Sequence, residues 1–141
     1  MRLPMAIGMA LALAGCAQPG PEGIIDYVHG DNARSYIVGF QPGSAKLDKE
    51  SVKVVTDAAT DAVKYHAALV VITGHADRVG PKDQNQELSR RRALAVRRLM
   101  ESEGVNRRII TVKAAGEDDQ LVPTDDNVPA PTNRNAEIII R

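Results

Sequence analysis

The sequence predicts one α/β domain (an α+β sandwich), with a mixed sheet in the order β-α-β-α-β-β and both helices on one face. Two observations support this prediction. Short β-branched or alternating apolar runs recur after residue 33, and two amphipathic stretches of helical period separate the first three of them. Right-handed crossovers leave few ways to assemble such an order. A chain of 141 residues has room for one such domain and a short additional segment.

Composition excludes several classes of function. The 18 Lys and Arg residues balance 18 Asp and Glu residues, whereas a dedicated nucleic-acid-binding domain usually carries a basic excess. One cysteine excludes a disulfide framework and a cysteine-based zinc site. An aromatic content of 3% leaves few platforms on which sugars or unpaired bases stack. The function must therefore be inferred from motifs.

Residues 1–16 (MRLPMAIGMALALAGC) have the pattern of a bacterial export signal. Arg2 precedes an apolar run that is shorter than the ~20 residues needed to span a bilayer. The run ends in Leu-Ala-Gly-Cys, which resembles the lipobox, where a peptidase cuts and the cysteine thiol is lipidated. An ordinary signal peptide, or a buried helix with a chance cysteine, is the alternative. We expect residues 1–15 to be a signal peptide and Cys16 to carry the lipid.

Residues 16–33 are expected to be a flexible tether that leads to the domain, residues 34–141. The tether mixes Pro, Gly and polar residues, with a period of neither 2 nor 3.6. Ala17, rather than Asp, follows the cysteine. In the Gram-negative lipoproteins that this segment resembles, that residue implies sorting to the outer membrane. The domain is then expected to face the periplasm.

The first half of the domain is predicted from β-propensity and a capping signal. Residues 34–40 are β-branched and aromatic, which predicts a strand. Asp48 is a suitable N-cap for an amphipathic helix that ends near residues 65–66. Residues 69–73 (LVVIT) form a continuous apolar run, which is typical of a strand buried on both faces.

The second half of the domain is predicted in the same way. Asn85 is a candidate N-cap for the second helix, and Gly104 is a candidate C-terminal stop. Residues 108–114 alternate in polarity and predict a strand. A loop rich in Asp and Pro follows at residues 116–132, and residues 136–141 (AEIIIR) predict the last strand.

The residues best suited to bind a ligand follow the second predicted strand, and α/β sheets hold their sites in such loops. Asp77 lies in the loop GHADRVG, and Arg92 shares a face of the following helix with Leu88. One interpretation is a simple Asp77–Arg92 salt bridge. The other is that the two side chains are held apart. A zwitterion then fits between them, with its ammonium at Asp77 and its carboxylate at the planar guanidinium.

The stretch GHADRVGPKDQNQELSRRRA resembles the signature of the OmpA-like peptidoglycan-binding family, written loosely GH-T/A-D-x-x-G and then N-x-x-LS-x-x-RA. With the lipobox, the layout is similar to that of the peptidoglycan-associated outer-membrane lipoproteins. The resemblance implies non-covalent binding of peptidoglycan at the meso-diaminopimelate residue of its stem peptide. It implies no catalytic activity and no cofactor.

The resemblance also implies the residues of the ligand site. Asp77 matches the family's ligand-binding aspartate, and Arg92 matches its binding arginine. Asn85 matches the asparagine that opens the helix, where it is expected to cap and to contribute to the pocket. Leu88 is expected to form the pocket wall. Arg134 matches an arginine of the closing NR-R-VEI motif, near the pocket mouth.

Three alternatives to wall binding remain open. The domain can be a scaffold lipoprotein that docks a Tol-type, secretion or motor complex in the envelope. His75 and Asp77 can begin the metal site of a hydrolase, although two ligands are too few and no third is placed. The arginines at 90–92 can suggest nucleic acid, although Glu87 and Glu101 are spaced to pair with them and with the arginines that follow. We expect no bound metal and no nucleic-acid partner.

Overall fold

The β-branched and amphipathic runs of the sequence form regular elements at the expected places. The computed structural model describes residues 33–141, so the predicted signal peptide, Cys16 and nearly all of the tether lie outside the described residues. The elements are β1 (Arg34–Gly39), α1 (Lys49–Lys64), β2 (Val70–His75), α2 (Lys82–Ser102), β3 (Ile110–Gly116) and β4 (Asn135–Ile140), with short 3-10 turns at Arg107–Ile109 and Pro131–Asn133. Within residues 33–141, neither helix is long and apolar enough to cross a membrane.

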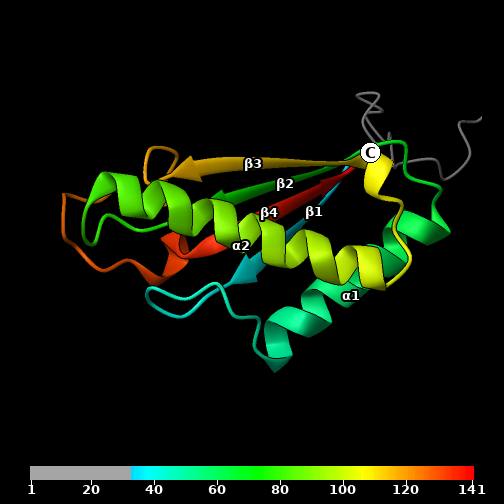
Figure 1. Ribbon diagram of the computed structural model, residues 1–141, viewed down its shortest axis with the longest axis horizontal. Helices are drawn as coiled ribbons and strands as arrows, with labels where there is room; N and C mark the ends of the chain where they lie inside the picture. The colour runs from blue at the N-terminus through cyan, green and yellow to red at the C-terminus, as the bar shows by residue number, and fades with distance from the viewer. Residues whose placement is uncertain (1–32) are drawn as a thin grey trace, which may run out of the picture.

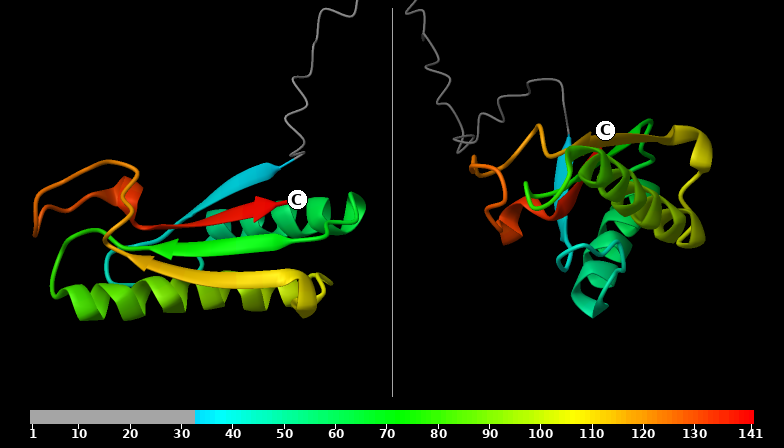
Figure 2. Two further views of the ribbon diagram at one scale, coloured as in Figure 1. Left: turned by 90° about the horizontal axis from the view of Figure 1, so that it is seen from above. Right: turned by 60° about the vertical axis from the view of Figure 1, so that its left-hand side comes forward.

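The four strands form one mixed sheet in the order β1-β4-β2-β3. The last strand, β4, lies between β1 and β2 and is antiparallel to both, whereas β2 and β3 are parallel. Figures 1 and 2 show both helices on the same side of this sheet. The predicted element order, mixed sheet and one-sided helix layer are therefore confirmed, with strand boundaries within two residues of those expected.

The hydrophobic core lies between the sheet and the two helices. The buried side chains of β2 alternate with half-buried ones, since Val70 and Ile72 face the helices, whereas Val71 and Thr73 do not. The prediction that β2 is buried on both faces is therefore wrong. One face of β2 is only half-buried because both helices lie on the other face of the sheet, so no helix of the described part of the chain covers this face.

Helix α1 begins where the capping signal predicted. The side chain of Asp48 accepts a hydrogen bond from the backbone nitrogen of Ser51 at 2.8 Å, which satisfies one free donor of the first turn. This bond also lowers the pKa of the Asp48 carboxyl. The helix ends at Lys64, one or two residues before the expected end.

Helix α2 begins three residues before the predicted cap. Its N-cap is Pro81, which makes no side-chain capping bond, and Asn85 is buried inside the first turns of the helix. The prediction that Asn85 caps the helix is therefore wrong. Its amide instead donates to Glu117 and to the carbonyl of Gly80, which removes it from any capping role. Gly104 has φ of +98° just beyond the helix end, as the C-terminal signal predicted.

Candidate ligand-binding site

The loops that follow β2 and β3 meet the β1–α1 connection at one end of the sheet, on the left in Figure 1 and opposite the C-terminus. A cavity of about 360 Å³ lies there, a size within the roughly 300–1,000 Å³ range of ligand pockets. The cavity is lined by Pro42, Gly43, Asp77, Val79, Gln84, Asn85, Leu88, Arg91, Pro129 and Arg134.

Asp77 supplies a fixed carboxylate to this cavity. The residue is 8% exposed and lies two positions beyond the end of β2. Its Oδ2 accepts hydrogen bonds from Nη1 of Arg134 at 3.1 Å and from the backbone nitrogen of Ala130 at 3.3 Å. Its Oδ1 has no hydrogen-bond partner within residues 33–141. One oxygen therefore anchors the side chain, and the other is left for a ligand.

Arg134, just before β4, is the ion-pair partner of Asp77. Its side chain is 12% exposed and lines both this cavity and a second one of about 330 Å³ on the β1–α1 side. The simple Asp77–Arg92 salt bridge, one of the two sequence interpretations, is therefore replaced by an Asp77–Arg134 pair. The two residues lie 57 positions apart, so no local spacing indicated this pair.

Arg92 does not line the cavity. It is fully buried, and its Nε, Nη1 and Nη2 donate to the carbonyls of Ser44, His75 and Gln41 at 2.9, 2.8 and 3.1 Å. The expectation that the guanidinium faces an open gap opposite Asp77 is wrong for this structure. The physical reason is that each of the three guanidinium nitrogens already donates to a main-chain oxygen, and these oxygens come from two segments of the chain.

The charge of Arg92 is retained despite its burial. Burial lowers the pKa of the guanidinium to about 10, while the negative charge of Asp77 acts in the opposite direction. At neutral pH the group is therefore protonated. A guanidinium has five N–H groups, and three are used, so one remains without an acceptor on each terminal nitrogen within the described residues.

Asn85 and Leu88 occupy the α2 wall of the cavity. The amide of Asn85 donates to a carboxylate oxygen of Glu117 at 2.7 Å, so its polar end fastens the β3–β4 loop to the helix. Leu88 is 8% exposed and gives the wall an apolar surface. These two residues therefore determine the shape of the cavity wall, while Asp77 and Arg134 contribute charged side chains to the lining.

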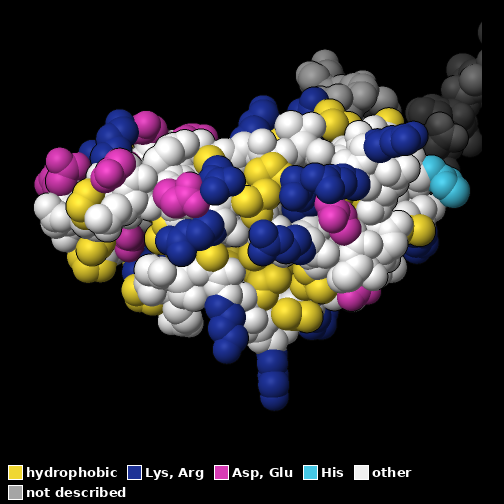
Figure 3. Space-filling view, viewed as in Figure 1, with side chains coloured by type: hydrophobic (Ala, Val, Ile, Leu, Met, Phe, Trp, Pro, Cys, Tyr) yellow, Lys and Arg dark blue, Asp and Glu magenta, His cyan; other side chains and the backbone are white. Residues whose placement is uncertain are grey.

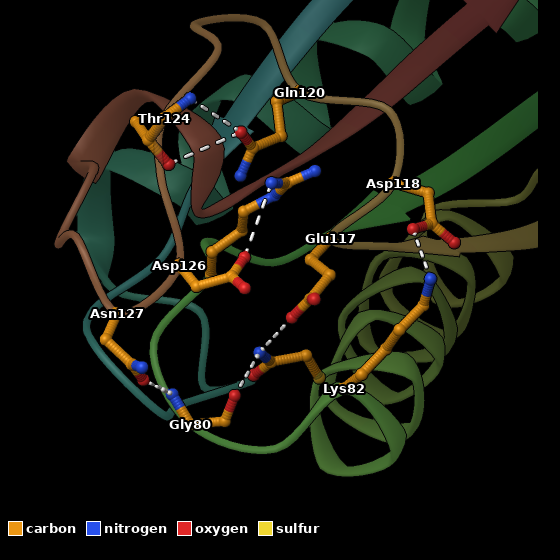
Figure 4. Close-up of polar contacts among 10 residues, drawn as sticks. Gly80, Lys82, Glu117, Asp118, Gln120, Thr124, Asp126 and Asn127 are labelled. Atoms are coloured by element: carbon orange, nitrogen blue, oxygen red, sulfur yellow. Dashed lines mark hydrogen bonds and ion pairs between the residues drawn. The ribbon is translucent and has the colours of Figure 1, made fainter.

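The long β3–β4 loop is held against the start of α2 by polar contacts, several of which Figure 4 shows. Lys82 pairs with Asp118 at 2.6 Å, and the backbone nitrogen of Gly80 donates to the side chain of Asn127 at 3.2 Å. These bonds join segments that lie more than 30 positions apart in the sequence. The rim of the cavity is therefore cross-linked by side chains whose partners no local motif indicates.

Several cavity residues were missed by sequence reasoning, Arg91 among them. Helical spacing indicated that Arg92 faces inward with Leu88, and Arg92 is indeed buried, but it lies beneath the cavity rather than in it. The position of Arg91 depends on where the β1–α1 connection and the β3–β4 loop fold back. Arg91 occupies an unspecified position of the Leu-Ser-x-x-Arg motif, so the motif gives no signal for it.

His75 has a structural partner. It is 5% exposed, and its Nδ1 lies 2.8 Å from the main-chain carbonyl oxygen of Asp119 in the β3–β4 loop. Among residues 33–141, no group of three or more His, Cys, Asp or Glu side chains is placed to hold a metal ion. The described residues therefore give no support to the hydrolase alternative.

A mixed sheet, a one-sided helix layer and a cavity with a fixed carboxylate define a small α/β domain with a charged cavity at one end of its sheet. Comparison with known proteins identifies the family of this domain. The OmpA family model matches residues 39–134. An outer membrane protein of Gluconacetobacter diazotrophicus is 32% identical over 114 residues, which cover 77% of this chain and 30% of that protein. The chain belongs to the OmpA family, and it spans less than a third of the length of that relative.

Solved structures share the fold. The OmpA-like domain of FopA1 from Francisella tularensis superposes with a TM-score of 0.70 at 21% identity, covering 77% of this chain and 75% of that domain. The peptidoglycan-associated lipoprotein from Burkholderia pseudomallei gives a TM-score of 0.69 at 22% identity, covering 75% and 90% of the two chains. The OmpA-like fold predicted from the sequence motif is therefore confirmed.

Proposed function

We propose that this domain binds peptidoglycan non-covalently, at the meso-diaminopimelate residue of the stem peptide, and catalyses no reaction. The observation that carries the proposal is Asp77, a nearly buried carboxylate that lines an open cavity with one oxygen unused. Diaminopimelate ends in an amino acid zwitterion, so it offers the ammonium that such an oxygen binds. Membership of the OmpA family supports the same ligand class.

Each site residue has a role in this proposal. Oδ1 of Asp77 accepts the ammonium, and Leu88 contacts the methylene chain of the ligand. Arg134, which already lines the cavity, attracts the carboxylate from the open side. Arg92 is a positioning residue, because its bonds to the carbonyls of Gln41 and Ser44 hold the segment that contributes Pro42 and Gly43 to the cavity. Asn85 keeps the wall of the cavity in place through Glu117.

The test compares two stem peptides that differ by one carboxylate. We expect a diaminopimelate-type fragment to bind at least about tenfold more tightly than a lysine-type fragment, as measured by calorimetry. The lysine side chain lacks the carboxylate, and a hydrogen bond to a charged group contributes roughly 1.5–3 kcal/mol. Asp77→Asn, which keeps the shape of the side chain and removes its charge, is expected to weaken the binding of both fragments. Equal affinity of the wild-type protein for the two fragments would remove the zwitterion argument.

We further propose that the chain is an outer-membrane lipoprotein that ties the membrane to the wall from the periplasmic side. The proposal rests on the export signal and the lipobox-like Leu-Ala-Gly-Cys at residues 13–16. Stable anchoring needs more than one acyl chain, because each buried CH₂ contributes only ~0.8 kcal/mol. The likeness to an outer membrane protein and to a peptidoglycan-associated lipoprotein supports the same location.

Replacing the lipidated residue is the simplest test of anchoring. Cys16→Ser is expected to move the protein from the membrane pellet to the soluble fraction, because the serine hydroxyl does not receive the lipid. The far-UV circular dichroism is expected to stay unchanged, since the substitution does not alter residues 33–141, which form the sheet and both helices. A variant that still sediments with membranes after a high-salt wash contradicts the lipobox interpretation.

A further inference from the structure

Arg91 lies on the exposed side of α2, between two adjoining hollows. It lines the cavity that contains Asp77 and also a neighbouring hollow of about 350 Å³, which is otherwise lined by Asp83, Gln84 and Glu87. Gln84 is the other residue that the two hollows share. The two spaces therefore meet at Gln84 and Arg91, and a ligand longer than one residue has a path past them.

Within the described residues, the N–H groups of Arg91 have no hydrogen-bond acceptor, in contrast to those of its two neighbours in the helix. Arg90 donates from Nε and Nη2 to the two carboxylate oxygens of Glu87, each at 2.9 Å. Arg92 donates to three main-chain carbonyls. Within residues 33–141, the guanidinium of Arg91 makes no hydrogen bond or close ion pair. The pKa of Glu87 is lowered chiefly by the bond from Arg90, and the charge of Arg91 contributes only weakly to that shift.

The surroundings of Arg91 determine where an anion can bind. Figure 3 shows that the face carrying α2 holds many Lys and Arg side chains and fewer Asp and Glu side chains. The outer hollow, in contrast, is lined by Asp83 and Glu87, which repel an anion placed farther out. A ligand carboxylate is therefore most stable at the junction of the two hollows, beside Arg91.

We propose that Arg91 is a specificity-determining residue, which binds a second carboxylate of the stem peptide. This carboxylate is the free α-carboxylate of the γ-linked glutamate that precedes diaminopimelate. The inference rests on the proposed function, because it needs the diaminopimelate head to lie at Asp77. An exposed guanidinium can bind a carboxylate through two parallel hydrogen bonds. Amidation of the glutamate replaces that carboxylate by a neutral group that makes no such ion pair.

Calorimetry on the purified protein in detergent tests this inference with three ligands: free meso-diaminopimelate, the tripeptide L-Ala-γ-D-Glu-meso-diaminopimelate, and the same tripeptide with the glutamate α-carboxyl amidated. We expect the wild-type protein to prefer the acidic tripeptide over the amidated one by about fivefold to tenfold, a modest factor because Arg91 is exposed. Arg91→Gln is expected to abolish this preference. The measured quantity is the ratio of the two tripeptide affinities, so an equal loss of affinity for both tripeptides in this variant does not count as support.

The matched control is Arg98→Gln, which removes the same charge from an exposed position of α2 that lines neither hollow. It is expected to keep the full preference. The inference is overturned if Arg91→Gln retains the preference, or if Arg98→Gln loses it equally. Failure of free diaminopimelate to bind the wild-type protein overturns the proposed function itself. Normal binding of diaminopimelate with no preference between the tripeptides overturns only the role of Arg91.

Discussion

Replacing Gly74 by alanine is expected to lower the free energy of unfolding by about 3 kcal/mol or more. A Cβ at this position would lie 1.8 Å from the carbonyl oxygen of Ser89 and 2.7 Å from its carbon, both main-chain atoms of α2. Helix and strand must therefore separate. This movement breaks the bond from the backbone nitrogen of Gly116 to the Ser89 hydroxyl. Urea unfolding followed by circular dichroism measures the loss.

The matched control for Gly74 is Gly39, the last residue of β1. A Cβ built there meets no atom within 4 Å, so Gly39→Ala is expected to change the free energy of unfolding by less than about 1 kcal/mol. The Gly74 variant is also expected to lose ligand binding, because α2 forms one wall of the cavity. If Gly74→Ala unfolds at the same urea concentration as the wild-type protein, α2 packs against the sheet differently from the packing described above.

Replacing Arg92 by lysine is expected to destabilise the domain by about 3 kcal/mol. Lysine keeps the charge, but its donors radiate from a single nitrogen and do not reach three carbonyls on two segments. The carbonyls of Ser44, His75 and Gln41 therefore lose part of their hydrogen bonding. Urea unfolding of Arg92→Lys measures the change.

The role of Arg92 in ligand binding is separable from its role in stability. Arg98→Lys is the control, because it makes the same exchange at an exposed position of the same helix. Calorimetry with a diaminopimelate fragment is run at a temperature at which Arg92→Lys remains folded. An unchanged free energy of unfolding combined with lost binding would show that Arg92 acts on the ligand and not on the fold.

Much of the fold was predictable because its signals are local. The cap at Asp48 needs only the backbone nitrogen of Ser51, three residues away, and the stop at Gly104 needs only a positive φ. The start of α2 was not predictable in this way. Asn85 has the chemistry of a cap, but its amide bonds to Glu117, 32 positions later. A long-range partner thus overrides a local preference.

The site was predictable only in part, and through the family motif more than through local spacing. The motif assigned both Asp77 and Arg134 to the pocket, but it did not indicate that the two side chains pair across 57 positions of sequence. The helical period indicated that Arg92 faces inward. It does not indicate that the guanidinium donates hydrogen bonds to main-chain carbonyls of the β1–α1 connection. Gly74 lies inside β2, where its missing side chain lets α2 approach, and no local pattern indicates this close approach.

The position of β1 determines how the domain bears mechanical load. β1 starts at Arg34, at the end of the sheet away from the cavity, and β4 runs antiparallel beside it through six residue pairs. A pull between the chain before Arg34 and a ligand held at Asp77 acts along the strand axes. Because the ladder hydrogen bonds lie across those axes, the tension shears all of them together and does not unzip them one by one.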